Sequence, residues 1–243
     1  MTKPDPSKVS REAIAEDYDR RYQNVGDLRE SDTFYRWVLQ QLSPQPGKHL
    51  LDVACGEGHM VKWALQQGLK GAGIDISINA ARLSREVVPV SFAAVADGER
   101  LPFLDESFDY VTNMGSLEHF LDPQRGVREM RRVLRPDGRV AVFLPNSYYL
   151  VDIIWHVWRT GYSVSHKQVV ERFATVREWR DVLEASGLRV DRTCAYNFRF
   201  PRARSDWTWY RRHPRKWLNL LVAPFIPFNL SYSFLFIGSK RRA

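Results

Sequence analysis

The feature that most constrains this chain is an apolar run that contains an acidic residue and leads straight into a turn of small residues. Residues 50–58 read Leu-Leu-Asp-Val-Ala-Cys-Gly-Glu-Gly. The apolar run at 49–53 is typical of a short buried strand, and 60–67 carries apolar residues at helical spacing. A second strand is expected at 72–76. The pattern predicts a β-α-β unit with a Gly-rich turn, which points to a bound cofactor.

The charge of this turn indicates the ligand. A dinucleotide site uses Gly-x-Gly-x-x-Gly and a helix N-terminus to hold an anionic pyrophosphate. Here Met60 and Val61 stand where a third glycine would follow, and Asp52 and Glu57 add negative charge. S-adenosyl-L-methionine has no phosphate and offers an ammonium, a sulfonium and ribose hydroxyls, so it suits this turn better. Asp75, at the second strand end, is placed to accept from both ribose hydroxyls.

Several further segments carry one family signature in order along the chain. They are residues 51–58, 73–77, 96–103, 108–111, 117–119 and 132–139. With them the chain resembles the class I S-adenosylmethionine-dependent methyltransferases, in particular the type 11 methyltransferase-domain group, over roughly residues 15 to 195. Ala54 departs from the family, which often has glycine there. Because alanine adds only a methyl group, we expect the turn to survive with Ala54 at a negative φ.

The resemblance implies a set of cofactor contacts at successive strand ends. They are Asp52, Ala54, Gly56, Gly58, Asp75, Ile76, Asp97, Gly98, Asn113 and Tyr22. The first four would hold the methionine moiety, partly through ordered water, and Asp75 the ribose. Asp97 would take the adenine amino group, and Asn113 would border the sulfonium. Alone, Asp52 and Asp97-Gly98 would be ordinary turn formers, but together they indicate a site. Glu57 is given no role.

The segment 10–22 is predicted to be helical, with Ser10 as its cap. It contains Tyr18 and Tyr22 in a stretch similar to the segment that folds over the cofactor in many family members. Tyr22 or Tyr18 would then touch the methionine carboxylate or close the site. The alternative is that both tyrosines lie on the packed face of a helix.

Strand-like and helix-like segments alternate along the rest of the chain. Further strands are predicted at 107–112, 139–144, 188–196 and 232–238, and helices at 122–134 and 179–185. The Pro-Asp-Gly segment 136–138 is predicted to be the turn before the strand at 139–144. This alternation predicts an α/β, Rossmann-like, doubly wound and mostly parallel sheet with helices on both faces and its ligand at the carboxyl ends of the strands. The resemblance implies seven strands, the last antiparallel.

With 243 residues and 44% hydrophobic content, the chain can bury a full α/β core, so we expect one methyltransferase domain over 1–243. Within it we expect cap helices at 1–45, a cofactor-binding core at 46–145 and a substrate-side half at 146–243. The two cysteines form neither a disulfide framework nor a metal cluster. The first ten residues lack an apolar signal core, which favours a cytoplasmic protein.

Methyl transfer from a sulfonium asks mainly for an acceptor atom held close and in line. A base is needed only where the acceptor must lose a proton. His119, just after the fourth strand and beside the predicted donor methyl group, is the candidate base. The alternative is a structural histidine, since this Leu-Glu-His stretch is often structural in the family. His166 is the second candidate, against the alternative of a surface histidine.

Acceptor selection is expected to lie in two regions outside the shared motifs. The segment 145–173 carries enough aromatic surface to wall a pocket for a sugar, a ring or a lipid-like chain, and Tyr148, Trp155 and His166 are its candidate substrate contacts. These aromatics would alternatively pack a cap helix onto the sheet. The segment 197–230 is basic and rich in tryptophan, then apolar and interrupted by prolines.

The second segment, 197–230, suits an anionic membrane surface or a lipid-linked phosphate. It is too short and too interrupted to span a bilayer. The alternative is a solvated basic face over a packed loop, and the net charge of +8 fits both. Single-stranded nucleic acid could also stack on it, but no nucleic-acid module is visible, and Leu-Pro-Asn-Ser at 144–147 replaces the Asn-Pro-Pro-Tyr signature.

The sequence therefore predicts a methyltransferase that uses S-adenosyl-L-methionine and acts on a small-molecule or lipid-linked acceptor, first at oxygen, with nitrogen and carbon open. Two alternatives stand beside it. One is a non-catalytic cofactor-binding scaffold whose C-terminal region binds a membrane or a partner. The other is a nucleic-acid methyltransferase.

Overall fold

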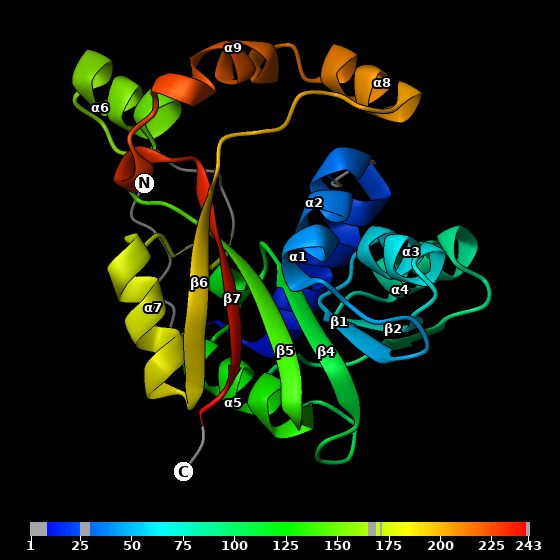
Figure 1. The fold of residues 1–243 in the computed structure, drawn as a ribbon. Helices are drawn as coiled ribbons and strands as arrows, with labels where there is room; N and C mark the ends of the chain where they lie inside the picture. The colour runs from blue at the N-terminus through cyan, green and yellow to red at the C-terminus, as the bar shows by residue number, and fades with distance from the viewer. Residues whose placement is uncertain (1–8, 25–29, 165–168, 171, 242–243) are drawn as a thin grey trace.

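A computed structural model describes residues 9–24, 30–164, 169–170 and 172–241. Its centre is a seven-stranded sheet in the order β3-β2-β1-β4-β5-β7-β6 (Figure 1). The strands are β1 (His49–Val53), β2 (Lys70–Asp75), β3 (Phe92–Val95), β4 (Phe108–Met114), β5 (Leu134–Pro145), β6 (Leu188–Tyr196) and β7 (Ser233–Lys240). Strand β7 runs antiparallel to both of its neighbours, and the other pairs are parallel. The predicted fold class is confirmed.

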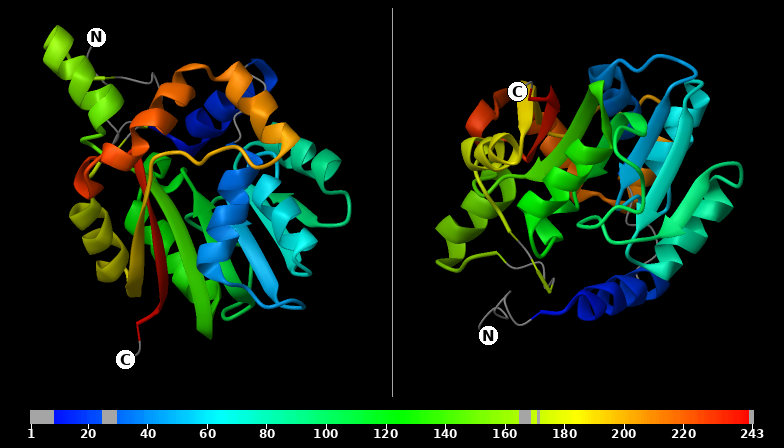
Figure 2. Two further views of the ribbon diagram at one scale, coloured as in Figure 1. Left: turned by 45° about the horizontal axis from the view of Figure 1, so that its top comes forward. Right: turned by 90° about the horizontal axis from the view of Figure 1, so that it is seen from below.

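Helices surround this sheet. They are α1 (Arg11–Asn24), α2 (Asp32–Leu42), α3 (His59–Gln66), α4 (Ile78–Val87), α5 (Pro123–Val133), α6 (Trp155–Thr160), α7 (Val176–Ala185), α8 (Arg204–Arg212) and α9 (Arg215–Val222). Four short helical turns join them: η2 (Leu117–His119), η3 (Leu150–Ile154), η4 (Ala223–Phe225) and η5 (Phe228–Leu230). Helix α1 lies beside α4, which Figure 2 shows from below in its right panel.

Alternating side chains of the strands build two cores, one on each face of the sheet. Leu50 and Ala141 pack with the apolar residues of α2 and α3. Their neighbours Leu51 and Val142 point to the opposite face and pack with α5 and α7. Successive side chains of a strand point to opposite faces, so consecutive apolar residues such as Leu50 and Leu51, or Ala141 and Val142, supply both cores.

The fifth strand is longer than its predicted span at 139–144. Strand β5 begins at Leu134 and includes the Pro-Asp-Gly segment 136–138, which the sequence pattern places in a turn. The backbone of Gly138 packs against β4, where an added β-carbon would lie 2.8 Å from the carbonyl oxygen of Asp109. The register of β4 with β5 shifts at this point. The turn prediction is wrong because the segment is accommodated as an irregularity within one strand.

The insertion between β6 and β7 forms α8 and α9, which lie with α6 at one end of the molecule (Figure 1). Helix α8 is fastened to α2 by two carboxylates. Asp206 accepts from the backbone N–H of Thr33 at 3.0 Å, and Asp32 accepts from the hydroxyl of Ser205 at 2.6 Å. The insertion is therefore held on the folded core at its first helix.

Candidate functional site

The turn after β1 is built from residues in the left-handed region of backbone conformation. Gly56 has φ +52° and Gly58, the residue that caps α3, has φ +79°. Ala54 has φ +58°, so the expectation that it keeps a negative φ is wrong. The chain must reverse here while the N–H of Cys55 still bonds Ile74 on β2 at 2.9 Å. That left-handed conformation costs a residue with a β-carbon about 1 kcal/mol.

Two buried carboxyl groups stand at the ends of neighbouring strands. Asp75 accepts from the N–H of Gly56 and from the N–H of Ser77, both at 2.9 Å, and burial raises the pKa of Asp75 to about 6. Asp52 accepts from the hydroxyl of Thr112 at 2.6 Å, and burial, with a smaller contribution from nearby Asp75, raises its pKa to about 7. Both groups pay for burial in their ionised forms, and a cation bound between them would offset that cost.

Two cavities adjoin at the carboxyl ends of the parallel strands, of about 600 Å³ and about 840 Å³. The predicted cofactor residues that line the first are Tyr22, Ala54, Asp75, Ile76, Asp97 and Gly98. Those that line the second are Tyr22, Asp52, Ala54 and Gly56. Tyr22 and Ala54 line both cavities, so the two spaces together suit one elongated ligand.

The cofactor contacts predicted for Asn113 and Gly58 stay predictions. The described lining of these two cavities includes neither residue. Asn113 is fully buried, its amide N–H₂ donates to the carbonyl of Val53 at 2.9 Å, and its amide oxygen accepts from the N–H of Leu117 at 3.0 Å. Its side chain is therefore used to join β1, β4 and η2. Ser116, in the loop between β4 and η2, lines both cavities. The sequence analysis assigns no role to this residue.

Helix α1 covers the site. Tyr18 and Tyr22 both line the two cavities, as the sequence predicts for a segment that closes over the cofactor. The Tyr22 hydroxyl lies directly against the Gly56 backbone, since an added β-carbon on Gly56 would be 2.6 Å from that oxygen. Asp19 accepts from the N–H of Asn79 at 3.2 Å, which fastens the middle of α1 to the start of α4. The packed-face alternative for the tyrosines also holds, because the packed face is the face that lines the cavities.

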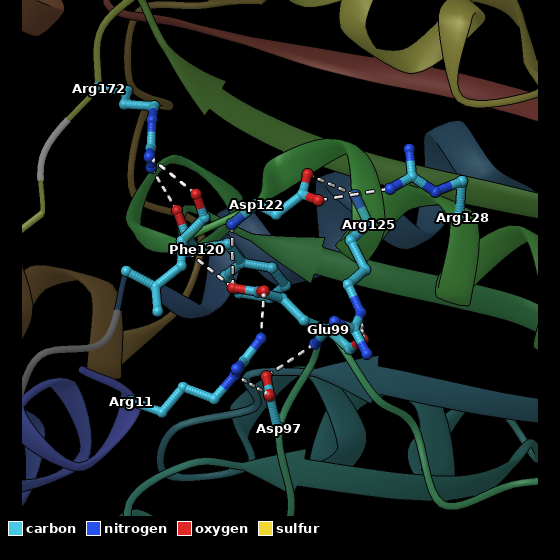
Figure 3. Close-up of polar contacts among 9 residues, drawn as sticks. Arg11, Asp97, Glu99, Phe120, Asp122, Arg125, Arg128 and Arg172 are labelled. Atoms are coloured by element: carbon cyan, nitrogen blue, oxygen red, sulfur yellow. Dashed lines mark hydrogen bonds and ion pairs between the residues drawn. The ribbon is translucent and has the colours of Figure 1, made fainter. Parts of the chain in front are cut away.

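The first turn of α1 is tied to the far side of the site by Arg11 (Figure 3). Its guanidinium donates to Asp97 at 2.7 Å and to Glu99 at 2.9 Å. The second oxygen of Glu99 accepts from the N–H groups of Leu121 and Asp122 at 2.7 and 3.2 Å. Asp97, the predicted adenine contact, thus lies in the first cavity with a cation already paired to it. This network also fixes the loop that follows η2.

His119 lies where the two cavities meet a third. The third cavity, of about 620 Å³, is lined by Glu118, His119, Pro145, Asn146, Tyr149, Asp152, Ile153, Arg172, Phe173 and Tyr232. The Nδ1 atom of His119 lies 2.7 Å from the carbonyl oxygen of Val170. A carbonyl can only accept, so Nδ1 carries a proton, and Nε2 lies 3.7 Å from the Oε1 atom of Glu118. The ring therefore joins the predicted cofactor space to a separate pocket.

The residues predicted to contact the acceptor are not gathered in the described part of the third cavity. Tyr148 and Trp155 are 56% and 55% exposed and do not line the described part of the third cavity. His166 lies outside the described residues. Tyr149 is buried in the third cavity instead, and its hydroxyl has no hydrogen-bond partner among the described residues. Tyr232, 83 positions away, faces the same cavity, a contact that no local sequence pattern indicates.

Residues 51–142 match the model of a family described as a methyltransferase domain. Methyltransferase GfsG of Streptomyces halstedii is 36% identical over 113 residues, which are 43% of this chain and 40% of that protein. Demethylmenaquinone methyltransferase of Renibacterium salmoninarum is 29% identical over 140 residues, 56% of this chain and 58% of that protein. The chain spans about half the length of the curated relatives it matches.

Two solved structures share the fold over nearly the whole chain. The cyclase SpnF has a TM-score of 0.67 at 17% identity, covering 97% of this chain and 98% of that one. Geranyl diphosphate C-methyltransferase of Streptomyces coelicolor, solved with Mg²⁺, geranyl diphosphate and S-adenosyl-L-homocysteine, has a TM-score of 0.65 at 14% identity, covering 95% and 97%. At such identities the likeness establishes the architecture, and chemistry has to be argued from the site.

Proposed function

We propose that this chain, which belongs to the class I S-adenosylmethionine-dependent methyltransferases, transfers a methyl group from S-adenosyl-L-methionine to a small-molecule or lipid-linked acceptor. The family follows from the matching domain at 51–142 and from the sheet order with its antiparallel β7. The cofactor, the acceptor and the roles of individual residues are argued from the cavities.

The first two cavities suit the cofactor in charge and in shape. Asp52 and Asp75 are buried carboxyls with raised pKa values, so a cationic ligand would stabilise their ionised forms. Gly56, which has no side chain, lets a ligand approach the backbone closely. The buried Nδ1 atom of His59, in the second cavity, has no partner among the described residues and offers a polar contact. When bound, S-adenosyl-L-methionine supplies an activated methyl group on its sulfonium.

The position of His119 at the junction of the three cavities carries the proposal. An acceptor in the third cavity would reach the cofactor space past this ring. The carbonyl of Val170 holds Nδ1, so Nε2 would take a proton from an acceptor hydroxyl as the methyl group is transferred. Alignment of donor and acceptor would supply most of the rate gain, and the base a smaller part.

The third cavity suits a flat molecule with polar substituents. Tyr149, Phe173 and Tyr232 supply aromatic walls, and Asp152 and Arg172 bring charged groups. We propose oxygen as the methylated atom because a hydroxyl gives His119 a proton to remove. Carbon is the second candidate, since two of the compared proteins are named as a demethylmenaquinone methyltransferase and a geranyl diphosphate C-methyltransferase.

A product assay with a matched variant tests this function. The full chain is incubated with S-adenosyl-L-methionine and a panel of phenols, quinols and lipid-linked alcohols, and S-adenosyl-L-homocysteine and the methylated atom are identified by mass spectrometry and NMR. For an acceptor that reacts, His119→Gln should lower kcat about 100-fold, because the general base is lost, while calorimetry still shows cofactor binding.

His49→Gln, at the start of β1 and outside the described linings of the three cavities, serves as the control and should leave turnover unchanged. If His119→Gln turns over at the wild-type rate at every pH, then His119 is not the general base. Cofactor binding without product from any acceptor would favour the non-catalytic scaffold, which the sequence left open, and nucleic-acid substrates added to the panel test the remaining alternative.

A further inference from the structure

Large apolar side chains are exposed on two segments that are far apart in the sequence. The first segment is α6 and the residues after it, and the second runs from the end of α9 to η5. Their exposed members are Trp155, Val157, Trp158, Tyr162, Leu221, Phe225 and Phe228. Trp158 is 75% exposed and Phe225 is 83% exposed. Scattered exposed apolar residues are ordinary, whereas a group of this size, rich in aromatics, indicates an interaction surface.

The fold brings the two segments to the same end of the molecule. Strand β5 ends at Pro145, before α6, and β7 begins at Ser233, after α9. These two residues are paired across the sheet. Figure 1 accordingly shows α6, α8 and α9 together beyond one end of the strands. We call the exposed apolar residues of α6 and of 221–228, with the arginines of α8, the apical face.

The exposed charge of the apical face is positive. The segment 197–230 has seven basic residues and one acidic residue, Asp206, which is fully buried. Arg199 lies 4.6 Å from the Trp37 ring and is committed to packing. Arg204 and Arg211 are exposed on α8. Aromatic groups beside exposed arginines match the polar boundary of an anionic bilayer, where tryptophan is enriched and each arginine adds attraction.

The stems of both segments line the third cavity. Asp152 and Ile153 come from η3, immediately before α6, and Tyr232 comes immediately before β7. A molecule that leaves the apical face between these stems would reach His119, which lines the same cavity. The apical face therefore lies on the approach to the proposed acceptor site.

We propose that the apical face docks on an anionic lipid bilayer, from which a lipid-soluble acceptor with polar substituents enters the third cavity. This rests on the proposed function and narrows its acceptor to molecules that partition into membranes. None of the helices in the described part of the chain is long and apolar enough to cross a bilayer. Insertion of a few aromatic side chains together with arginine attraction gives reversible binding.

Vesicle sedimentation of the full chain tests the proposal. The protein should sediment with vesicles containing phosphatidylglycerol, bind weakly to vesicles of phosphatidylcholine alone, and dissociate as salt is raised. The double variant Trp158→Ala with Phe225→Ala should lose at least about tenfold in binding, because its inserted aromatics are gone. Arg204→Glu and Arg211→Glu should each lose about fivefold or more.

Val90→Ala with Leu104→Ala is the matched control, since these apolar side chains are 87% and 83% exposed but lie before β3 and β4 rather than on the apical face. It should bind vesicles as the wild type does. No sedimentation with anionic vesicles, or equal losses in the control, would overturn the proposal. A second outcome would also overturn it. If the wild type forms dimers in analytical ultracentrifugation, the double variant Trp158→Ala with Phe225→Ala is monomeric and neither protein binds vesicles, then the apical face joins two copies of the chain.

Calorimetry with S-adenosyl-L-methionine separates this proposal from the proposed function. If the chain binds the cofactor but does not bind vesicles, the docking proposal is contradicted and the proposed function stands. If the chain binds vesicles through Trp158 and Phe225 but does not bind the cofactor, the docking proposal stands and the proposed function is contradicted.

Discussion

Ala54 holds a conformation that glycine would adopt at no steric cost. Its φ of +58° places the β-carbon against its own backbone. We predict that Ala54→Gly stabilises the fold by up to about 1 kcal/mol, because relief of strain exceeds the added freedom of the unfolded chain. Urea unfolding measures it. Ala81→Gly, within α4, is the control and should destabilise by about 1 kcal/mol; an equal loss at both sites would mean that Ala54 is not strained.

At the scale of single residues, the sequence predicts what depends on local geometry. Asp52 and Gly56 sit in one short motif around a turn, Asp75 ends the next strand, and all three line the two cavities at the carboxyl ends of the strands. Asn113 also follows a strand, but its amide is consumed by backbone partners that lie on other elements. Tyr149 is indistinguishable in the sequence from exposed Tyr148, because only the path of the chain after β5 decides which of them is buried.

At the scale of elements, helix α1 packs closely against the turn after β1. We predict that Gly56→Ala weakens cofactor binding and destabilises the fold, because the new β-carbon would meet the Tyr22 hydroxyl at 2.6 Å and φ is +52°. Left-handed strain alone costs about 1–2 kcal/mol. In a Tyr22→Phe background the added methyl meets only the ring at 3.6 Å, so part of the loss should be recovered.

A double-mutant cycle of Gly56→Ala and Tyr22→Phe, followed by thermal unfolding and by calorimetry, gives the coupling energy directly. Additive effects would show that α1 does not rest on Gly56 in solution. The matched control is Tyr148→Phe in place of Tyr22→Phe, since the exposed Tyr148 should not couple to Gly56.

Element boundaries were predictable only in part. Strand β6 has the predicted bounds, whereas helix α7 begins at Val176, before its predicted start at 179, because the capping box of Thr175 and Glu178 starts the helix earlier. Strand β5 is not predictable to its start, because its Pro-Asp-Gly segment is usually a turn and only pairing with β4 holds it in the sheet. The helices α8 and α9 were not located either, since their sequence mixes arginines, tryptophans and prolines without clear helical spacing.

At the scale of the whole molecule, charge divides the site into two ends. The cofactor cavities contain the buried carboxyls Asp52 and Asp75, although the chain as a whole carries +8. The excess of positive charge lies partly in 197–230, around the proposed approach of the acceptor. His119 lies between the two ends. A cationic donor and a membrane-derived acceptor would thus meet from opposite sides of one ring.

The buried carboxyls also make cofactor binding dependent on pH. Burial raises the pKa of Asp75 to about 6 and that of Asp52 to about 7, so both bind protons near neutrality in the free protein. A cationic ligand favours the ionised forms, and its binding must release those protons. Affinity should therefore rise with pH through about 6 to 7 and level off above it.

Calorimetric titration of S-adenosyl-L-methionine into the wild type and Asp75→Asn, on both sides of that pH range, tests the central claim most directly. The wild type should bind, more tightly at the higher pH and with release of protons. Asp75→Asn should bind at least about tenfold more weakly at the higher pH, with a flatter dependence on pH, because one carboxylate that favours the cation is gone. Equal affinity of the two proteins at both pH values would contradict the claim that these cavities receive a cationic nucleoside.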